Sequence, residues 1–513
     1  MSGPVPNRTH RWILVAMAGL AALALTFYAL PSWDTLVDDA YISARYSELF
    51  AHGHGVVYNA GEPPVEGVTN LAWTLLVGLG RVFGLPMIPM LTGLGWAFGV
   101  LAIGGCTALA YTLSRGASRL EAAALAAFAL ALEPHLAVAC TNGLESSMMV
   151  ASVLWATWAV VTPSVRRPVA GLFVALLPWV RPEGLAVVAG LWCFQALRYW
   201  WDGTAPRDLP RQMLSLVAPG VASLVVLFSW RLWTYGLWLP NTYYAKVAFP
   251  LSESWTVNDQ YLKPEWLTAA VMVPAWLLGL VLPPRRWERV IVAVLALGLT
   301  AIPMTVYLWM PGFRLFLPSI ALTIALVASA VAWLPVWVAR TSVTVLILGM
   351  LGLHHQESKR IQGYDGRHSV LPANGAQRAA EHLAAHAPEG AWLATRDAGV
   401  LAYYVGPDVK VAELHQRALT QPHPDGAATA VLKLTPENPT FFISTVQRKN
   451  ADKIAYGNDK LIWRRMKVPY VYLGRVEQHY HRFYDIYVRR DANIPPLPDD
   501  IVVNRAGPQH TTR

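Results

Sequence analysis

Long runs of apolar residues fill the first 352 positions and restrict this part of the chain to a membrane-embedded helical fold. A helix that crosses a bilayer needs roughly 20 such residues. Candidate runs lie at 12–30, 86–114, 120–138, 146–161, 169–180, 185–198, 212–230, 264–282, 290–309, 315–338 and 342–353. Residues 1–352 hold 36 charged side chains, whereas the 161 residues of 353–513 hold 37. Soluble proteins carry roughly 25% charged residues, so we predict a membrane domain over 1–352 and a soluble domain over 353–513.

The distribution of Lys and Arg predicts the orientation in the membrane, because cytoplasmic loops prefer these residues. One further apolar stretch, 70–84, is interrupted by three glycines and an arginine. If it lies along the membrane surface and the N-terminus is cytoplasmic, 13 of the 20 basic residues before the tail fall on the cytoplasmic side. We therefore predict about 11 spans, a first outer loop at about 31–70, a juxtamembrane helix at about 70–84 and an extracytoplasmic tail. The first span is interpreted as an uncleaved signal anchor in a bacterial plasma (inner) membrane.

The tail has the pattern of an α/β domain. Short runs rich in β-branched and aromatic residues predict strands at 391–395, 409–412, 441–446, 470–476 and 483–488. Helical periodicity covers about 375–387, and 398–404 is a further short helix candidate. The three cysteines all lie before the tail, so no disulfide framework is expected there. The net charge of +9 divides nearly evenly between the two parts, which argues against a nucleic-acid-binding arm.

On this topology, polar residues of the membrane domain collect at its outer side. Ionisable groups at membrane depth are costly unless they are paired or face a wet cavity, so each is a functional candidate. The acidic candidates for catalysis are Asp38, Asp39 and Glu66. For one aspartate of the pair, capping of the helix at 40–50 is an equal alternative; the other would act as a base toward an acceptor hydroxyl. Further candidates for substrate binding are His54, Asn70, Asn142, Glu145, Glu183, Asn241 and Tyr244.

Three cations at outer helix ends, Arg181, Lys246 and Arg314, are candidates for an anion-binding cradle. Taken singly, each could instead be an interfacial anchor. His54, with His52, flanks a glycine, and this pattern favours a turn over a metal site. No cytoplasmic loop holds a phosphate-binding glycine motif, so the chemistry is placed outside, where an activated donor must arrive attached to a lipid. No cofactor is expected, and a divalent metal ion stays an open alternative.

These motifs resemble the GT-C superfamily of polytopic glycosyltransferases, which use polyprenyl-phosphate sugars. Asp38-Asp39 resembles the acidic pair in the first extracytoplasmic loop of that superfamily. The longer series, through Gly53-His54-Gly55 and Glu66-Gly67 to Thr69-Asn70, is similar to a bacterial subgroup that includes mycobacterial terminal arabinofuranosyltransferases. Similar motifs follow at 142–145, 181–184, 240–246 and 310–314, and in the tail at 397–399 and 403–404.

The resemblance implies an inverting transfer of a sugar from a polyprenyl-phosphate donor to a hydroxyl of a glycan, lipid or protein. Asp38 would be the base, Glu66 would share that role or bind sugar hydroxyls, and the three cations would stabilise the leaving phosphate. The tail would bind the acceptor or cover the cavity. Two alternatives stay open: a lipid or solute transporter, and a protein O-mannosyltransferase or lipid A modifier. A transporter is disfavoured because its ionisable groups would lie near the bilayer midplane on broken helices.

Overall fold

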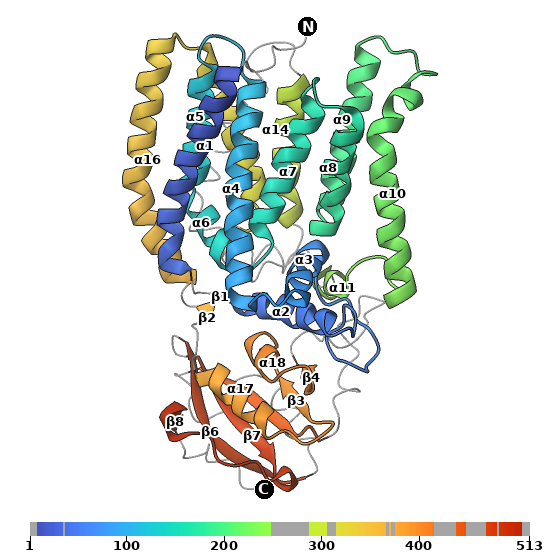
Figure 1. Ribbon diagram of the computed structural model, residues 1–513, viewed down its shortest axis with the longest axis vertical. Coiled ribbons are helices and arrows are strands. Elements are labelled where there is room, and N and C mark those ends of the chain that lie inside the picture. Colours follow the sequence, from blue (N-terminus) through green and yellow to red (C-terminus); the bar gives the residue numbers. More distant parts are fainter. Residues whose placement is uncertain are drawn as a thin grey trace. The chain divides into compact units, whose positions relative to one another are not determined.

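The computed structural model describes residues 8–33, 36–247, 287–304, 314–365, 369–370, 375–414, 438–447, 468–479 and 482–504. The fold is mostly helical, with a mixed β-sheet in the C-terminal part of the chain (Figure 1). Two compact units can be separated. The first, here called the helical unit, takes Met1–Trp33, Thr92–Trp230 and Phe249–Gly363; the second, here called the mixed unit, takes Asp34–Leu91, Arg231–Ala248 and Tyr364–Arg513. The predicted domain boundary at 352/353 stays a prediction.

The helices of the helical unit follow the apolar runs of the sequence. They are α1 (Arg8–Ala29, followed by the 3-10 turn η1, Leu30–Ser32), α4 (Met87–Leu113), α5 (Arg119–Ala131), α6 (Pro134–Thr141), α7 (Ser146–Val161), α8 (Arg167–Val180), α9 (Gly184–Trp201), α10 (Leu209–Tyr235), α14 (Trp287–Met304), α15 (Leu317–Ala330, followed by η3, Val331–Trp333) and α16 (Val336–Asp365). The predicted span at 264–282 lies outside the described residues. The predicted run 315–338 ends early, because η3 and Pro335 separate α15 from α16.

The predicted span at 120–138 is two helices rather than one. α5 and α6 meet at a bend of 56°. Pro134 lacks a backbone N–H and occupies the first turn of α6, and the Glu133 carboxylate accepts the amide N–H of His135. The sequence thus ends one helix and caps the next at this point. Among the described residues, three helices are long and apolar enough to cross a membrane, or four if this bent pair counts as one span.

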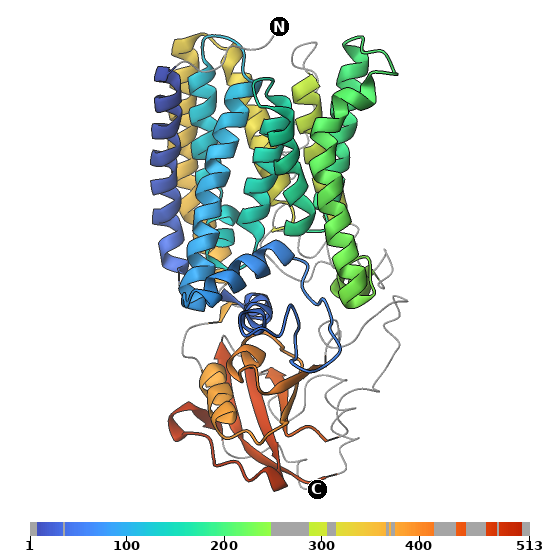
Figure 2. The ribbon, with the colours of Figure 1, turned by 45° about the vertical axis from the view of Figure 1, so that its right-hand side comes forward.

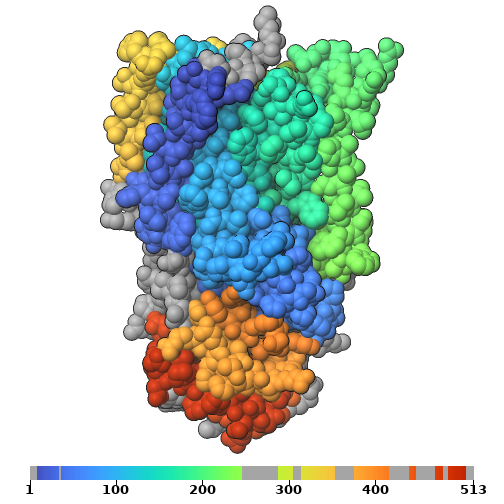
Figure 3. Space-filling model, in the orientation of Figure 1, coloured from blue at the N-terminus to red at the C-terminus, as the bar shows by residue number. Residues whose placement is uncertain are grey.

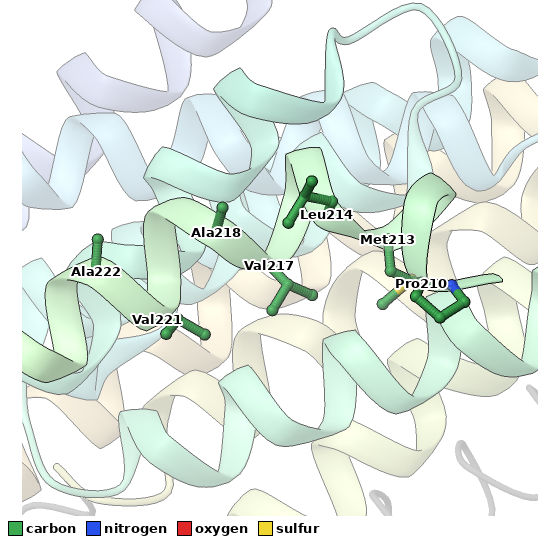
Figure 4. A pocket seen from close by; sticks show the side chains of 7 residues that line it. All are labelled: Pro210, Met213, Leu214, Val217, Ala218, Val221 and Ala222. Atoms are coloured by element: carbon green, nitrogen blue, oxygen red, sulfur yellow. The ribbon is translucent and has the colours of Figure 1, made fainter. Parts of the chain in front are cut away.

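Helix α10 stands at one edge of the helical unit, next to α8 and α9 (Figure 2). It packs closely on these helices: a Cβ at Gly220 would collide with Trp192, and Ser223 accepts a hydrogen bond from Trp179 Nε1 at 2.7 Å. Its opposite face lines an apolar groove of about 510 Å³ (Figure 4). The lining residues repeat at helical spacing: Pro210, Met213, Leu214, Val217, Ala218, Val221 and Ala222. None of the predicted site residues lies in this groove.

The mixed unit joins the first loop of the chain to the tail. From the N-terminal region it contains β1 (Leu36–Val37), α2 (Asp38–Ala51) and α3 (Leu71–Val82), followed by α11 (Asn241–Val247). The tail adds β2 (Ser369–Val370), α17 (Gly375–Ala385), β3 (Trp392–Thr395), α18 (Val400–Tyr404), β4 (Lys410–Glu413), β5 (Phe441–Gln447), β6 (Tyr470–His479), β7 (Arg482–Arg489), η5 (Arg490–Ala492), η6 (Asp499–Ile501) and β8 (Val502–Asn504). β1 pairs with β2 in antiparallel register, with Leu36 opposite Val370. The start of the first loop therefore lies beside the start of the tail.

The larger sheet has six strands in the order β4-β3-β5-β7-β6-β8. β3 runs parallel to β4 and β5, and the remaining pairs are antiparallel. The five predicted strands and both predicted helices of the tail are confirmed, each within a few residues at its ends. Trp392, Tyr470 and Tyr472 pack against a buried core that includes Phe442 and Tyr487. Aromatic and β-branched residues on adjacent strands therefore make this sheet as their intrinsic preference predicts.

Candidate active site

Asp38 is the first residue of α2 and follows strand β1 directly. The N-cap residue of α2 is Val37, whose backbone is extended, so neither aspartate occupies the N-cap position and both lie in the first turn of the helix. Asp38 Oδ1 accepts a hydrogen bond from the backbone N–H of Val400 at 2.9 Å. Asp39 lies half-buried in the same first turn.

Gly399 allows the tail to approach Asp38 this closely. A Cβ at position 399 would overlap the backbone oxygen and the carboxyl group of Asp38. The motif Asp397-Ala398-Gly399, which the resemblance singled out, thus lies beside the predicted catalytic acid. Tyr403 and Tyr404 extend this contact, since their rings lie 5.8 and 5.7 Å from that of Tyr41 on α2.

Arg45 is a residue of this region that sequence reasoning missed. It is 2% exposed and donates to the carbonyl oxygens of Ala402, Gly406 and Val409 in the tail, as well as to Tyr58 O in the loop. Asn59 adds a reciprocal pair with Val411, accepting its N–H and donating to its carbonyl oxygen, each at 2.8 Å. Figure 3 shows the resulting contact, where the blue surface of the loop abuts the orange surface of the tail. The partners in the tail are backbone groups more than 350 positions away, so no sequence motif marks them.

Glu66 is 1% exposed and forms a bidentate ion pair with Arg231. Arg231 lies in the last part of α10, which belongs to the mixed unit together with Glu66. Arg231 Nε lies 2.9 Å from Oε2, and Nη2 lies 2.9 Å from Oε1. Burial raises the pKa of Glu66 to about 7, although the guanidinium group opposes the rise. The Glu66 carbonyl oxygen also accepts the N–H of Asn241 at 2.8 Å. Sequence analysis did not single out Arg231, although an arginine in an apolar helix of 27 residues is a clear signal.

Asn70 and His54 differ sharply in their surroundings. Asn70 is buried and exchanges hydrogen bonds with Ser43 of α2, while its Oδ1 also accepts from Thr74 Oγ1. This side chain therefore holds α2 against α3. His54 is exposed in a turn between Gly53 and Gly55, whose φ angles of +83° and +81° favour glycine.

The motif at 240–246 comprises Pro240 and most of the short helix α11 that follows it. Asn241 is fully buried and starts the helix. Tyr244 is half-buried, with its ring edge-on to Tyr243 at 5.9 Å. The backbone of Lys246 belongs to α11, but its side chain lies outside the described residues. The mixed unit thus contains Asp38, Asp39, His54, Glu66, Asn70, Asn241, Tyr244 and Lys246.

Three predicted residues of the helical unit form one buried cluster. Arg181, in the turn between α8 and α9, donates to both carboxylate oxygens of Glu183 at 3.2 and 3.0 Å and to Glu145 at the start of α7. All three side chains are largely buried. One guanidinium group with two carboxylates has a formal charge of −1. Arg181 therefore does not stand as an isolated cation, and its role toward a donor phosphate stays a prediction.

The remaining two predicted residues also belong to the helical unit. Asn142 ends α6, and its Oδ1 accepts the N–H of Leu144 at 3.0 Å, which turns the chain toward α7. Arg314 is half-buried in the turn before α15. The residues 310–313 of its motif lie outside the described part of the chain. Among the described residues, no group of three or more His, Cys, Asp and Glu is arranged to hold a metal ion.

These features define a class of membrane protein: a mostly helical chain with a mixed-sheet region and acidic residues at the start of the helix that follows the first apolar helix. The fold is GT-C-like. The chain is similar to ArnT from Cupriavidus metallidurans bound to undecaprenyl phosphate, with TM-score 0.60 and 14% identity over 92% of this chain and 97% of that one. It is also similar to the Archaeoglobus fulgidus oligosaccharyltransferase in complex with Zn and sulfate, with TM-score 0.52 and 12% identity over 93% and 74%.

A third structure, AglB from Archaeoglobus fulgidus in complex with an inhibitory peptide and a dolichol-phosphate, has TM-score 0.54 and 11% identity over 79% of this chain and 65% of that one. No protein-family model and no curated protein sequence matches the chain. At these identities the comparison shows the fold alone.

Proposed function

We propose that this protein is an inverting membrane glycosyltransferase that moves a sugar from a polyprenyl-phosphate donor to a hydroxyl acceptor. The GT-C-like fold over nine-tenths of the chain, with Asp38 at the start of α2, carries this proposal. The solved relatives bound to undecaprenyl phosphate and to dolichol-phosphate support a lipid phosphate as the leaving group. An arabinofuranosyl or other pentose or hexose donor, and a cell-envelope glycan, lipid or protein acceptor, complete the proposal.

In the proposed reaction the acceptor oxygen attacks the anomeric carbon while the bond from that carbon to the phosphate oxygen breaks. The acceptor proton passes to the carboxylate of Asp38, and the polyprenyl phosphate leaves with the bonding electron pair. A phosphate is a stable anion, so its departure needs electrostatic stabilisation more than a strong general acid. Arg181, Lys246 and Arg314 are the proposed sources of positive charge.

The two other predicted acids have different environments. Both oxygens of Glu66 accept hydrogen bonds from Arg231, and the side chain is 1% exposed. This pairing supports a positioning role for Glu66 rather than that of a second base. Asp39 stays a catalytic candidate beside Asp38.

The proposed setting is a bacterial plasma membrane with about 11 spans, a cytoplasmic N-terminus and an extracytoplasmic tail. A reporter fused to the C-terminus tests the orientation: it should be active outside the cytosol, and activity in the cytosol would reverse the topology.

The function is tested with purified protein, a panel of undecaprenyl- and decaprenyl-phosphate pentoses and hexoses, and mass spectrometry of the products. We expect one donor to lose its sugar with release of polyprenyl phosphate. Asp38→Asn, which keeps the size of the side chain but removes its basicity, should abolish this release while leaving donor binding intact. Asp38→Asn with full activity would exclude Asp38 as the base, and a panel without any turnover would contradict the proposed function.

A further inference from the structure

The carboxylate of Asp38 is held by the backbone of the tail. Val400 donates its N–H to Asp38 Oδ1 at 2.9 Å, and Gly399 lies where any side chain would overlap the aspartate. Asp38 and Val400 are 362 positions apart in the sequence. This donor comes from the tail rather than from the helix that carries the aspartate.

The segment that carries this amide is itself fixed on both sides. Tyr58 donates its hydroxyl to Ala398 O at 2.5 Å, and Arg45 donates to the carbonyl oxygens of Ala402 and Gly406. From the tail, Thr445 Oγ1 donates to Asp397 Oδ2 at 2.9 Å. Val400 is fully buried. These bonds restrict residues 397–406, so the Val400 N–H points at Asp38 in a set direction.

The bond from the Val400 amide is compatible with a carboxylate that acts as a base. It uses one lone pair of Oδ1, and a carboxylate offers about four such positions on its two oxygens. The bond restricts rotation of the carboxyl group and stabilises its ionised form, which is the form that accepts a proton. Asp39 is rotated about 100° around the helix axis from Asp38, so the same amide cannot serve both.

We propose that Gly399 and Val400 are positioning residues for the base: the tail amide orients the Asp38 carboxylate toward the acceptor hydroxyl, so that the tail is part of the catalytic machinery as well as a substrate-binding or covering element. This inference rests on the proposed function. Gly399 supplies the close approach and Val400 supplies the donor.

The contact itself is tested without any substrate, by hydrogen exchange of the Val400 amide in the full-length protein. Asp38→Ala removes the acceptor and should raise the exchange rate of this amide by about tenfold or more, because a hydrogen bond to a charged acceptor is lost. Asp39→Ala, the matched control in the same helical turn, should leave the rate within about twofold. Equal exchange in the two variants would show that the contact does not hold the tail and would overturn the proposal.

The catalytic consequence is tested by comparing Val400→Pro with Val400→Ala. Proline is accepted at the first position of a helix but has no N–H, whereas alanine keeps the donor and loses the buried methyl groups. We expect Val400→Pro to lower kcat about tenfold relative to Val400→Ala, with the donor KM within about twofold. The acid limb of its pH–rate profile should move to higher pH by up to about one unit, since the carboxylate loses a donor that stabilises its charge. Gly399→Ala, which displaces the carboxyl group, should lower kcat in the same way.

The outcomes separate the two proposals. If the wild-type protein turns over no donor of the panel, the proposed function fails, whatever hydrogen exchange shows of the contact. If the wild-type protein is active and Val400→Pro matches Val400→Ala in both kcat and pH profile, the positioning role fails and the proposed function stands. Both variants could also lose thermal stability equally and show no difference in kcat or pH profile. That result would likewise mean that the contact supports folding only, and the positioning role would fail.

Discussion

Arg231 near the end of α10 donates to both carboxylate oxygens of Glu66, a residue of the first loop 165 positions earlier. Both side chains are about 1% exposed. Two charges removed from water in this way are stable together, but either one left alone is costly. The pair therefore fixes the loop that follows α2 to Arg231–Tyr235, the end of α10 that belongs to the same unit as the loop, and Asn241 adds a backbone bond to the same loop residue.

Replacing Arg231 alone should strongly destabilise the protein. Arg231→Met leaves Glu66 buried without its partner, at an expected cost of about 3–5 kcal/mol. The double variant Glu66→Met with Arg231→Met removes both charges and should recover most of that loss. Thermal and denaturant unfolding in detergent measure the difference. A double variant no more stable than Arg231→Met would show that packing, rather than charge pairing, is what the two side chains supply.

The raised pKa of Glu66 predicts a pH dependence of stability. The unfolded chain loses this proton near the ordinary pKa of 4.5, whereas in the folded protein burial raises the pKa to about 7. Between these values the folded protein binds more protons than the unfolded chain, so stability should fall as pH rises through this window, by up to about 3 kcal/mol in all. Glu66→Gln should lack this decline. The unfolding midpoint between pH 4.5 and 7.5, wild type minus Glu66→Gln, isolates the effect, and a difference that stays constant with pH would contradict it.

The sequence predicts elements well and partners poorly. α7 coincides with the predicted run at 146–161, and the strands of the tail match, because apolar runs and β-branched composition are local properties of the sequence. Ionisable residues could be marked as costly, but neither the pairing of Glu66 with Arg231 nor the bond between Asp38 and Val400 follows from residue types. Both depend on segments that meet only after folding. Pro134 lies at the break before α6, but the apolar run at 120–138 is still long enough to predict a single span.

We expect that even lysine cannot replace Arg45 without a loss of stability. Its guanidinium group serves several tail carbonyl oxygens at once, and a lysine ammonium cannot reproduce that planar set of donors. Arg45→Lys should lower stability by about 2–4 kcal/mol, because buried carbonyl groups lose their donors. It should also speed amide exchange in α18 and β4. Arg81→Lys is the control: Arg81 also forms a bidentate pair, but with Glu48 and only partly buried, so its loss should stay below about 1 kcal/mol. Equal losses of stability in the two variants would show that the contacts of Arg45 with the tail contribute no more than a partly buried ion pair.

The cluster around Arg181 predicts a mutation that improves donor binding, whereas most mutations near a binding site weaken it. Arg181 is outweighed by two carboxylates, so it can attract a phosphate more strongly once one of them is neutral. If Arg181 contacts the donor phosphate, Glu145→Gln should lower the donor KM about two- to fivefold, which corresponds to at most about 1 kcal/mol. Glu121→Gln also removes one negative charge from the helical unit, but Glu121 pairs with Arg340 instead, and this variant should leave KM unchanged. KM values measured with the polyprenyl-phosphate sugar that the panel identifies decide the matter: an unchanged or raised value in Glu145→Gln would assign Arg181 to the folding of α8 against α9 and leave the donor phosphate to other cations.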